Sequence, residues 1–352
     1  MTEIISDKKG AMVLAAGFGT RLKPLTQERP KPLVEVFGRP LICYNLDHLA
    51  KVGVEKVVIN THYLGDSLKA SLGDVYRGMI LEFVHEPEIL GTGGGLKNVA
   101  DRLKAYDTLF LMNADAFVDV DLRHLIQARS EADALSALLL KRVDDAHSFG
   151  AIGTDINGRV VSFVNRIPVK QPPHLERMFC GVHLFKQEFL SWVKQGEGTF
   201  CINQETYPNV LKSEQTVVGV DQLGLFQDVG TPQRLLALHW EIFAGHTSLN
   251  YLDVFKRFSS ASHACHDVER HVFCHAKATV ACDMTNVSKV FIEENVHIDS
   301  GVTLGQEVVI GPDVKVGKGA TLERVVVQSG TEIAPGQVFK GGIVYPGGFI
   351  QA

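Results

Sequence analysis

The chain has 352 residues, 45% of them hydrophobic, and a formal net charge of −5 at pH 7. A chain of this length is expected to divide into two domains, because single cores stop growing near roughly 250 to 300 residues. The acidic balance argues against nucleic acid or an anionic membrane as a partner, since those surfaces need a broad basic field. Residues 1–10 are polar and no long apolar run follows, so we expect a cytoplasmic protein. Six cysteines are too few for a disulfide framework, so we expect free thiols.

The first two thirds of the chain alternate short apolar runs with segments of helical periodicity. Residues 40–53 place apolar side chains at helical spacing before a glycine. The runs of strand length cover residues 11–16, 56–61, 80–86 and 108–115. This order predicts an α/β domain with a Rossmann-like, mostly parallel sheet, which binds ligands at the carboxyl ends of its strands.

Further elements complete this first domain. Residues 149–164 are typical of two strands around a turn at 155–158, and residues 177–185 of another strand. Residues 231–245 are expected to form a helix, with Thr231 as N-cap and Gly245 as the stop. We therefore predict a first domain over residues 1–245 and a linker over residues 246–270.

After about residue 270, aliphatic residues recur every six positions with glycines between them. The positions are Ile292, Ile298, Leu304, Ile310, Val316 and Leu322, and the period resumes at Val327 after a one-residue slip. This period predicts a β-helix over residues 271–352, in which three rungs of six residues close one coil. Exposed coil ends favour assembly, so we expect a homo-oligomer through this region.

The stretch from Val13 to Leu33 reads VLAAGFGTRLKPLTQERPKPL. A predicted strand leads into Gly17 and Gly19, where the missing Cβ lets backbone N–H groups converge on an anion. Arg21 follows two residues later, and two prolines stiffen the backbone around Lys31. The spacing matches neither the dinucleotide GxGxxG motif nor the P-loop. The stretch therefore predicts a phosphate site of another kind.

The same stretch matches every defined position of LAAGxGTRLxPLTxxxPKPL, the signature of the sugar-1-phosphate nucleotidyltransferases. The chain resembles this family over about residues 11–245. The repeat region is similar to the C-terminal left-handed β-helix of longer members, which include GDP-mannose pyrophosphorylases. The resemblance implies nucleotidyl transfer from an NTP to a sugar 1-phosphate, which gives a nucleotide sugar and pyrophosphate and requires Mg²⁺.

The resemblance assigns roles to the signature residues. Arg21 would hold the departing pyrophosphate, and Lys31 would reach the α-phosphate and the sugar phosphate. In-line displacement between two polyanions needs alignment and cancelled repulsion more than covalent help, which explains the cations. The residues placed on the triphosphate are Ala15, Gly17, Gly19 and Thr20. Solvated surface charge is the alternative interpretation of Arg21 and Lys31.

Two aspartates far apart in the sequence are expected to hold the metal. Asp115 and Asp228 each end a strand-like run, a position from which such sheets present side chains to ligands. Mg²⁺ prefers a few carboxylates together with phosphate oxygens. Both match metal positions of the family, although Ala114 stands where members commonly carry glycine. A turn or capping role is the alternative for either aspartate alone.

Residues 85–95, HEPEILGTGGG, are expected to line the nucleobase. The resemblance places Glu86, Gly91, Thr92 and Gly93 there, and glycine allows the close approach of a flat ring. A carboxylate at Glu86 can accept the N1 and N2 protons of guanine, whereas uracil offers one proton. We therefore expect GTP, but related uridylyltransferases carry similar residues here, so UTP stays open.

Sugar recognition is where the sequence departs from the family. Gly150, Gly181 and Glu205 match positions that contact the hexose. Many members carry Glu-Lys-Pro where this chain has Asn165 and Arg166. Arg166 keeps a cation for the sugar phosphate, whereas Asn165 lacks the carboxylate that often binds sugar hydroxyls. We expect mannose 1-phosphate from the whole-length resemblance, and glucose, heptose and N-acetylmuramate phosphates stay open.

Other functions are less consistent with the sequence. Histidines and cysteines gather over residues 263–282, but no C-x₂₋₄-C pair supports zinc. A single histidine at position 297 does not support acyl transfer. A catalytically silent regulatory subunit would have no reason to retain the glycines, both cations and both aspartates together. We therefore expect an active enzyme whose partners are an NTP and a sugar 1-phosphate.

Overall fold

The computed structural model describes residues 7–144, 151–163, 172–193, 198–245, 252, 254, 265–267 and 269–352. The chain forms two compact units that interleave along the sequence. The first comprises Met1–Gly19, Glu28–Pro32 and Ile42–Phe226, and the second comprises Thr20–Gln27, Leu33–Leu41 and Gln227–Ala352. The predicted boundary at residue 245 divides the chain into continuous segments, whereas each compact unit combines segments that are far apart in the sequence.

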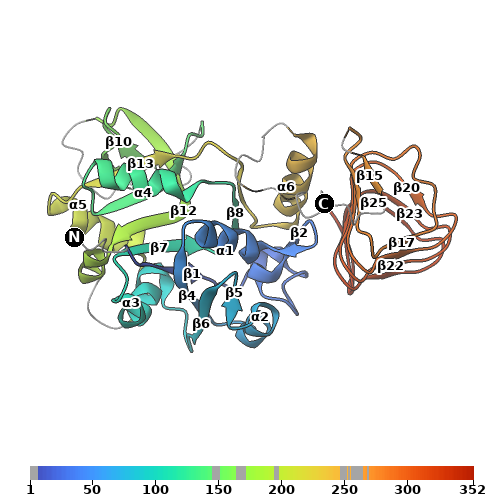
Figure 1. Ribbon diagram of the computed structural model, residues 1–352, viewed down its shortest axis with the longest axis horizontal. Coiled ribbons are helices and arrows are strands. Elements are labelled where there is room, and N and C mark those ends of the chain that lie inside the picture. Colours follow the sequence, from blue (N-terminus) through green and yellow to red (C-terminus); the bar gives the residue numbers. More distant parts are fainter. Residues whose placement is uncertain are drawn as a thin grey trace, which may run out of the picture. The chain divides into compact units, whose positions relative to one another are not determined.

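A ten-stranded sheet forms the centre of the first unit (Figure 1). Its main path runs β11-β10-β12-β7-β1-β4-β6-β5, and β9 and β13 join it beside β12. The central strands β7, β1, β4 and β6 are parallel to one another. They are β1 (Lys9–Leu14), β4 (Val54–Thr61), β6 (Met79–His85) and β7 (Thr108–Asn113). The four predicted strand runs are therefore confirmed.

The remaining strands make the sheet mixed. Strand β12 (Leu175–Lys186) is antiparallel to both β7 and β9 (Ser136–Lys141). The predicted pair around the turn at 155–158 is confirmed as β10 (Ile152–Thr154) and β11 (Val160–Phe163). The sheet also contains β5 (Val75–Tyr76) and β13 (Val217–Asp221), whereas β8 (Ala116–Val118) lies outside it. The fold is thus an α/β arrangement in which parallel pairing dominates the centre.

Helices cover this sheet (Figure 1). Helix α1 (Leu41–Lys51) fully buries Ile42, Leu46 and Leu49, which confirms the helical spacing predicted for this segment. The other helices of the first unit are α2 (Gly65–Leu72), α3 (Gly91–Leu103), α4 (Leu122–Glu131) and α5 (Tyr207–Lys212).

The core of the first unit lies between the sheet and its helices. Met12 and Leu111 from β1 and β7, Leu96 from α3 and Tyr207 from α5 are all fully buried in it. Burial of apolar surface contributes about 25 cal/mol per Å². This packing fixes the relative positions of the central strands and of the loops that leave their carboxyl ends.

Helix α6 (Pro232–Ala244) belongs to the second unit. The side chain of Thr231 accepts a hydrogen bond from the backbone N–H of Arg234, and Gly245 ends the helix in the left-handed conformation at φ 63°. Both predicted caps are confirmed. Strands β2 (Glu35–Val36) and β3 (Arg39–Pro40) form a small hairpin in the same unit, and β14 (Phe226–Asp228) precedes the helix.

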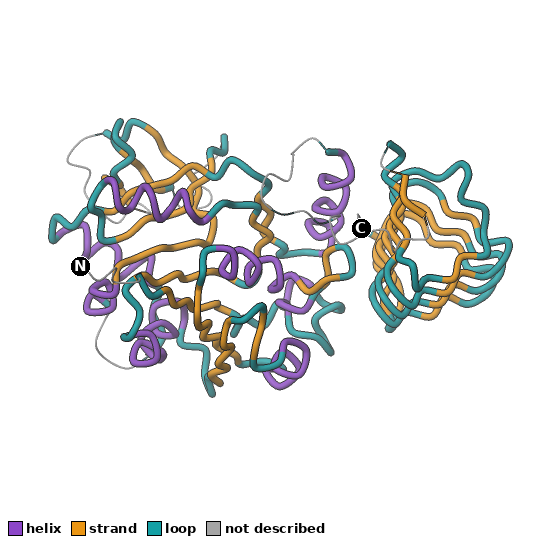
Figure 2. Tube along the Cα trace, in the orientation of Figure 1, coloured by secondary structure: helices purple, strands orange, loops and turns teal. Residues whose placement is uncertain are grey.

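The region of six-residue repeats, residues 271–352, is called the hexapeptide-repeat region below. It forms two stacks of parallel strands (Figure 2). The longer stack contains β16 (Val272–Cys274), β18 (Val290–Ile292), β21 (Val308–Ile310), β23 (Thr321–Val327) and β25 (Val338–Tyr345). The shorter one contains β17 (Thr279–Val280), β19 (His297–Ile298), β22 (Lys315–Val316) and β24 (Glu332–Ile333). Strand β20 (Thr303–Leu304) pairs with β23, and β15 (Cys265–Asp267) and β26 (Gly348–Gln351) pair antiparallel at the ends.

The strand register in this region reproduces the predicted period. Leu304 pairs with Leu322, eighteen residues later, whereas Ile310 pairs with Val327, seventeen residues later. Three rungs of six residues therefore return the chain to the same strand stack. The shortening falls between Leu322 and Val327, where the slip was predicted. The six periodic aliphatics are all buried in one core.

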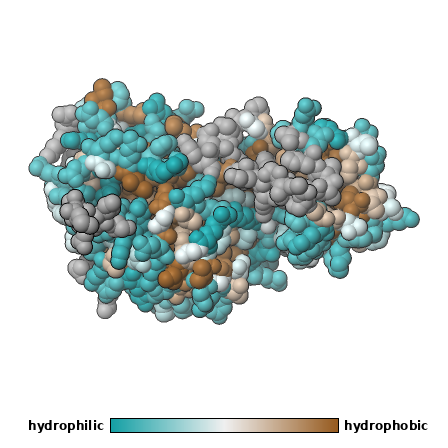
Figure 3. All heavy atoms as spheres, in the orientation of Figure 1, coloured by the Kyte–Doolittle hydropathy of each residue, from teal (hydrophilic) through white to brown (hydrophobic). Residues whose placement is uncertain are grey.

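Three further observations concern the surface, the helices and the thiols of the described residues. Figure 3 shows a face on which hydrophilic side chains (teal) predominate. In the described part of the chain, no helix is both long and apolar enough to span a membrane. The five cysteines whose side chains are described are free thiols, and burial raises the pKa of Cys180 to about 12.

Candidate active site

The carboxyl ends of the four central strands carry the candidate site. The glycine turn follows β1, Asn60 lies near the end of β4, Glu86 follows β6, and Asp115 follows β7. Because these strands are adjacent and parallel, the segments emerge along one edge of the sheet. The sequence predicted this edge as the ligand side.

A buried asparagine connects the glycine turn to helix α3. The Ala15 N–H donates to Oδ1 of Asn60 at 2.8 Å, and Nδ2 of Asn60 donates to Oε1 of Glu86 at 2.8 Å. The second carboxylate oxygen of Glu86 accepts from the Leu90 N–H at 3.2 Å. Sequence reasoning missed Asn60, although a polar residue near the end of an apolar strand run is a usable signal.

Glu86 is fully buried, and both of its carboxylate oxygens accept hydrogen bonds from this network. The network stabilises the carboxylate away from water and holds the start of the glycine turn. The structure thus gives Glu86 a positioning function. Its contact with a nucleobase stays a prediction.

The glycine turn presents exposed backbone. A Cβ on Gly17 would meet no atom within 4 Å, and Gly19 has a φ of 61°, which favours glycine. Phe18 between them is 49% exposed, and the edge of its ring contacts His62 at 5.1 Å between centroids. Backbone N–H groups of such a turn can reach an anion without side-chain obstruction.

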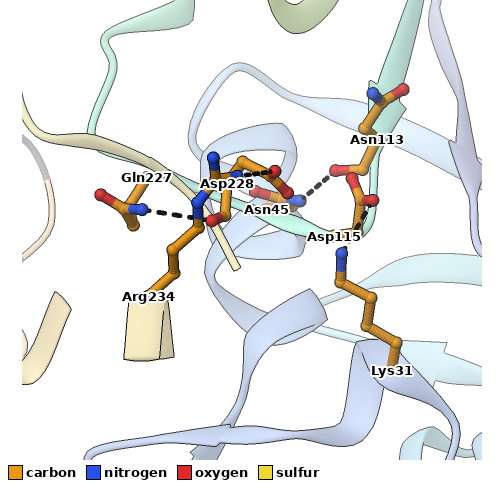
Figure 4. A network of polar contacts seen from close by, with 7 residues as sticks. All are labelled: Lys31, Asn45, Asn113, Asp115, Gln227, Asp228 and Arg234. Carbon is orange, nitrogen blue, oxygen red and sulfur yellow. Dashed lines mark hydrogen bonds and ion pairs between the residues drawn. The ribbon is translucent and has the colours of Figure 1, made fainter. Parts of the chain in front are cut away.

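Lys31 and Asp115 come together from distant segments. Lys31 lies on a 3₁₀ turn, η2 (Lys31–Leu33), and its Nζ donates to Oδ2 of Asp115 at 3.0 Å (Figure 4). The lysine is buried, whereas the Asp115 side chain is 46% exposed and can reach a ligand. Nδ2 of Asn45 donates to the Asn113 carbonyl at 2.9 Å and supports the loop after β7. The predicted catalytic lysine and a predicted metal ligand are therefore neighbours.

Arg21, Asp228 and Arg234 form a second charged group, within the second unit. Nη1 of Arg234 donates to Oδ2 of Asp228 at 2.5 Å (Figure 4). A Cβ on Gly230 would lie 3.1 Å from the same Asp228 oxygen and 3.2 Å from Nη2 of Arg21. The predicted pyrophosphate ligand and the second predicted metal ligand thus lie beside the same glycine. Sequence reasoning missed Arg234, a basic residue in the first turn of α6.

The donor chemistry fits Mg²⁺. Asp115 and Asp228 offer hard carboxylate oxygens, which this ion binds in small number together with substrate phosphates. Among the described residues, no group of three or more histidine, cysteine, aspartate or glutamate side chains could hold an ion. The assignment of both aspartates to one ion stays a prediction.

The glycine run at residues 91–95 begins helix α3, which the sequence did not indicate. A Cβ on Gly91 would lie 2.6 Å from the Phe200 carbonyl oxygen, and one on Gly93 would lie 2.3 Å from the Phe200 ring. Oγ1 of Thr92 accepts from the Ile202 N–H at 3.0 Å. These residues thus have a packing function, and their contact with a nucleobase stays a prediction.

The predicted sugar residues are described only in part. Gly181 has a φ of 71°, and a Cβ there would lie 3.1 Å from Cβ of Asn113, which ends β7. Glu205 lies in a π-helical turn over Ile202–Thr206, a feature common at functional sites. Gly150, Asn165 and Arg166 lie outside the described residues.

Comparison with known protein families shows which family the chain belongs to. The profile of a family described as nucleotidyl transferase matches residues 10–244. The chain belongs to the nucleotidyl transferase family. A second profile, for bacterial transferase hexapeptide repeats, matches residues 289–324. The family predicted from the signature, and the repeats predicted from the six-residue period, are therefore confirmed.

Curated proteins that are similar to this chain are named for more than one activity. The chain is 33% identical to a mannose-1-phosphate guanylyltransferase of Mycobacterium tuberculosis, over 63% of this chain and 61% of the relative. It is 29% identical to the mannose-1-phosphate guanyltransferase of Saccharomyces cerevisiae, over 64% and 62%. A UTP–glucose-1-phosphate uridylyltransferase of Synechocystis is 26% identical, over 62% and 60%. The chain thus spans about three fifths of the relatives it matches.

Proposed function

We propose that the protein transfers a nucleotidyl group from an NTP to a sugar 1-phosphate and releases pyrophosphate. The Lys31–Asp115 pair supports this most strongly, because it places a buried cation and an accessible carboxylate at the carboxyl ends of the parallel strands. Membership of the nucleotidyl transferase family supports the reaction class.

The charged groups account for the proposed reaction in physical terms. The backbone of the glycine turn binds the triphosphate, Arg21 binds the departing pyrophosphate, and Lys31 draws the two phosphates together. The sugar phosphate oxygen then attacks the α-phosphorus in line, and the bond to the pyrophosphate oxygen breaks. The protein supplies alignment and cancelled repulsion, which such transfers need most. Mg²⁺, bound through Asp115 and Asp228, would neutralise phosphate charge.

GTP and mannose 1-phosphate are the proposed substrates. Two of the relatives described above are named for this pair, and one for UTP and glucose 1-phosphate. The acidic side chain of Glu86 also favours guanine, provided that binding opens the buried network around it. UTP with glucose 1-phosphate, a heptose phosphate or N-acetylmuramate phosphate is the alternative.

A matrix of the four NTPs against a panel of sugar 1-phosphates, read by pyrophosphate release, tests these proposals. We expect release with GTP and mannose 1-phosphate and none from the Lys31→Ala variant. Faster turnover with UTP would overturn the base assignment alone. No release in any combination, with added Mg²⁺, would overturn the enzymatic function and favour a silent regulatory subunit.

The repeat region is proposed to be a left-handed β-helix that joins copies of the chain. Its parallel stacks and three-rung period support the β-helix, and its hexapeptide profile supports assembly. Light scattering of the full chain over a concentration series should give a mass above that of the 38.6 kDa monomer. A monomeric mass throughout would refute the assembly. The cytoplasm remains the proposed location.

A further inference from the structure

A hairpin directly after the signature stretch packs against the repeat region. This docking hairpin, Glu35–Pro40, consists of β2, β3 and the turn between them, and it starts two residues after η2, which carries Lys31. It belongs to the same compact unit as α6 and the hexapeptide repeats. Glu35, Phe37 and Gly38 of the hairpin each contact other parts of that unit in a different way.

Glu35 provides a polar anchor. Its Oε2 accepts a hydrogen bond from Oγ of Ser329 at 2.6 Å and another from the Ser329 backbone N–H at 3.2 Å. Glu35 is buried, so its carboxylate depends on such partners in place of water. Ser329 lies 294 residues further along the chain, in the repeat region.

Phe37 provides an aromatic anchor. Its φ of 48° is unusual for a bulky residue, and the hairpin's other turn residue, Gly38, also has a positive φ. The fully buried Phe37 ring lies 5.0 Å between centroids from His239, from Phe243 and from Phe291. The first two rings come from α6 and the third from β18. Aromatic packing therefore compensates for a backbone conformation that phenylalanine does not favour by itself.

The backbone of Phe37 is fixed as well. Its N–H donates to Nε2 of His239 at 3.1 Å, while Nδ1 of His239 donates to the Leu235 carbonyl at 2.8 Å. This pairing requires the neutral imidazole with its proton on Nδ1. Burial favours that form, because it lowers the pKa of His239 to about 4.

At Gly38 the backbone of the docking hairpin lies directly against side chains of the repeat region. With a φ of 65°, a Cβ at this position would lie 2.6 Å from Cγ of Glu293 and 3.0 Å from Cδ of Pro312. Both residues belong to the repeat region. A side chain at position 38 would therefore push the tip of the docking hairpin away from the repeats.

We propose that the hexapeptide-repeat region positions Lys31 by holding the docking hairpin through Glu35, Phe37 and Gly38. The hairpin follows η2 so closely that movement of its strands shifts the lysine and weakens its pairing with Asp115. Misplacement of a catalytic group by about 1 Å can cost about 100-fold in rate. The catalytic part of this proposal rests on the proposed function, whereas the positioning of the lysine does not.

The first test substitutes Gly38→Ala and measures the labelling of Lys31 by an amine-reactive reagent, followed by peptide mass spectrometry. Lys31 is 7% exposed, so we expect slow labelling in the wild type and at least threefold faster labelling in the variant. The control is Glu332→Gln, which alters an exposed ion pair with Lys315 in the repeats and should leave labelling unchanged.

The second test measures pyrophosphate release by the same variants. We expect Gly38→Ala to lower kcat about 10-fold or more with little change in KM, because it displaces the lysine without altering the substrate-binding glycines. The double variant Gly38→Ala/Glu293→Ala removes the nearest clashing atoms and should recover part of kcat. A variant that loses only stability would show unchanged kcat for its folded fraction and no such recovery.

Ser329→Ala keeps the test decisive if Gly38→Ala does not fold. It removes the shorter hydrogen bond to Glu35 and should change labelling and kcat in the same directions, by about two- to fivefold. Unchanged labelling and unchanged kcat in the folded variants would refute the positioning of Lys31. Faster labelling in a protein without any transferase activity would support the positioning and count against the proposed function.

Discussion

The hexapeptide repeats and the edge of the central sheet are stabilised in different ways. In the repeats, each buried aliphatic packs on its equivalent one coil away, and exposed ion pairs such as Lys315–Glu332 link neighbouring coils. At the sheet edge, a few buried polar groups depend on partners from distant segments, as in the network of Ala15, Asn60 and Glu86. The repeats thus distribute stability over many similar contacts, whereas the edge concentrates it in a few. Single substitutions should therefore have much larger effects at the edge.

The largest effect is expected from Lys31→Ala. Removing this cation should lower the rate of pyrophosphate release by about 10² to 10³, the range observed for comparable oxyanion donors. The matched control is Lys315→Ala, which removes an exposed lysine of the repeats and should retain full activity. Equal losses in both variants would contradict the difference between the two regions.

Asn60→Ala should cost about 3 kcal/mol in the free energy of unfolding. It removes the donor to Oε1 of the buried Glu86 carboxylate and leaves the Ala15 N–H without its Asn60 acceptor, and each such loss is worth about 1–3 kcal/mol. Urea denaturation of the full chain measures the change. Asn98→Ala, on the exposed side of α3, should stay within about 0.5 kcal/mol of the wild type.

Stability should fall in mild acid. Burial lowers the pKa of His48 to about 4, of His183 to about 3 and of His239 to about 4. Because these imidazoles titrate near about 6.5 once unfolded, the unfolded chain binds more protons below that pH. Their contribution to stability is therefore complete above about pH 6.5 and is lost progressively as the pH falls toward about 4.

Urea midpoints at about pH 7.5 and about pH 5 measure this dependence. His239→Leu should lower the midpoint at neutral pH, because the Phe37 N–H loses its acceptor, and should also reduce the pH dependence. His297→Gln alters an exposed histidine of the repeats and should leave the dependence unchanged. A midpoint that rises in acid would contradict the buried neutral imidazoles.

The smallest effect is expected from Ile298→Val in the repeats. Ile298 is fully buried between Val280 and Val316 of the neighbouring coils, and loss of one methylene should cost about 1 kcal/mol. Differential scanning calorimetry measures the shift of the transition. A loss above about 3 kcal/mol would show that the repeats also concentrate their stability in single residues.

Features determined by nearby residues could be predicted from the sequence. The period of the repeats, its slip after Leu322, and the caps of α6 at Thr231 and Gly245 depend on residues close in the chain. The central strands followed from their apolar runs. The carboxyl ends of these strands also indicated where Asp115 would lie, because adjacent parallel strands share an edge.

Features that depend on distant partners could not be predicted. The bond from Ser329 to Glu35 and the packing of Phe291 on Phe37 join segments about 250 residues or more apart. No local pattern marks position 37, because phenylalanine is a poor residue for its turn. The ion pair of Arg234 with Asp228 was missed for another reason, since the first turn of a helix usually favours acidic side chains.

The separation of Glu35 from Ser329 has a consequence for biosynthesis. At about 5–20 residues per second, a ribosome makes Ser329 on the order of 15–60 seconds after Glu35. During that interval the Phe37 ring lacks Phe291, and the Glu35 carboxylate lacks the two hydrogen bonds from Ser329. The signature stretch is therefore synthesised well before the repeat residues that complete the support of its neighbouring hairpin.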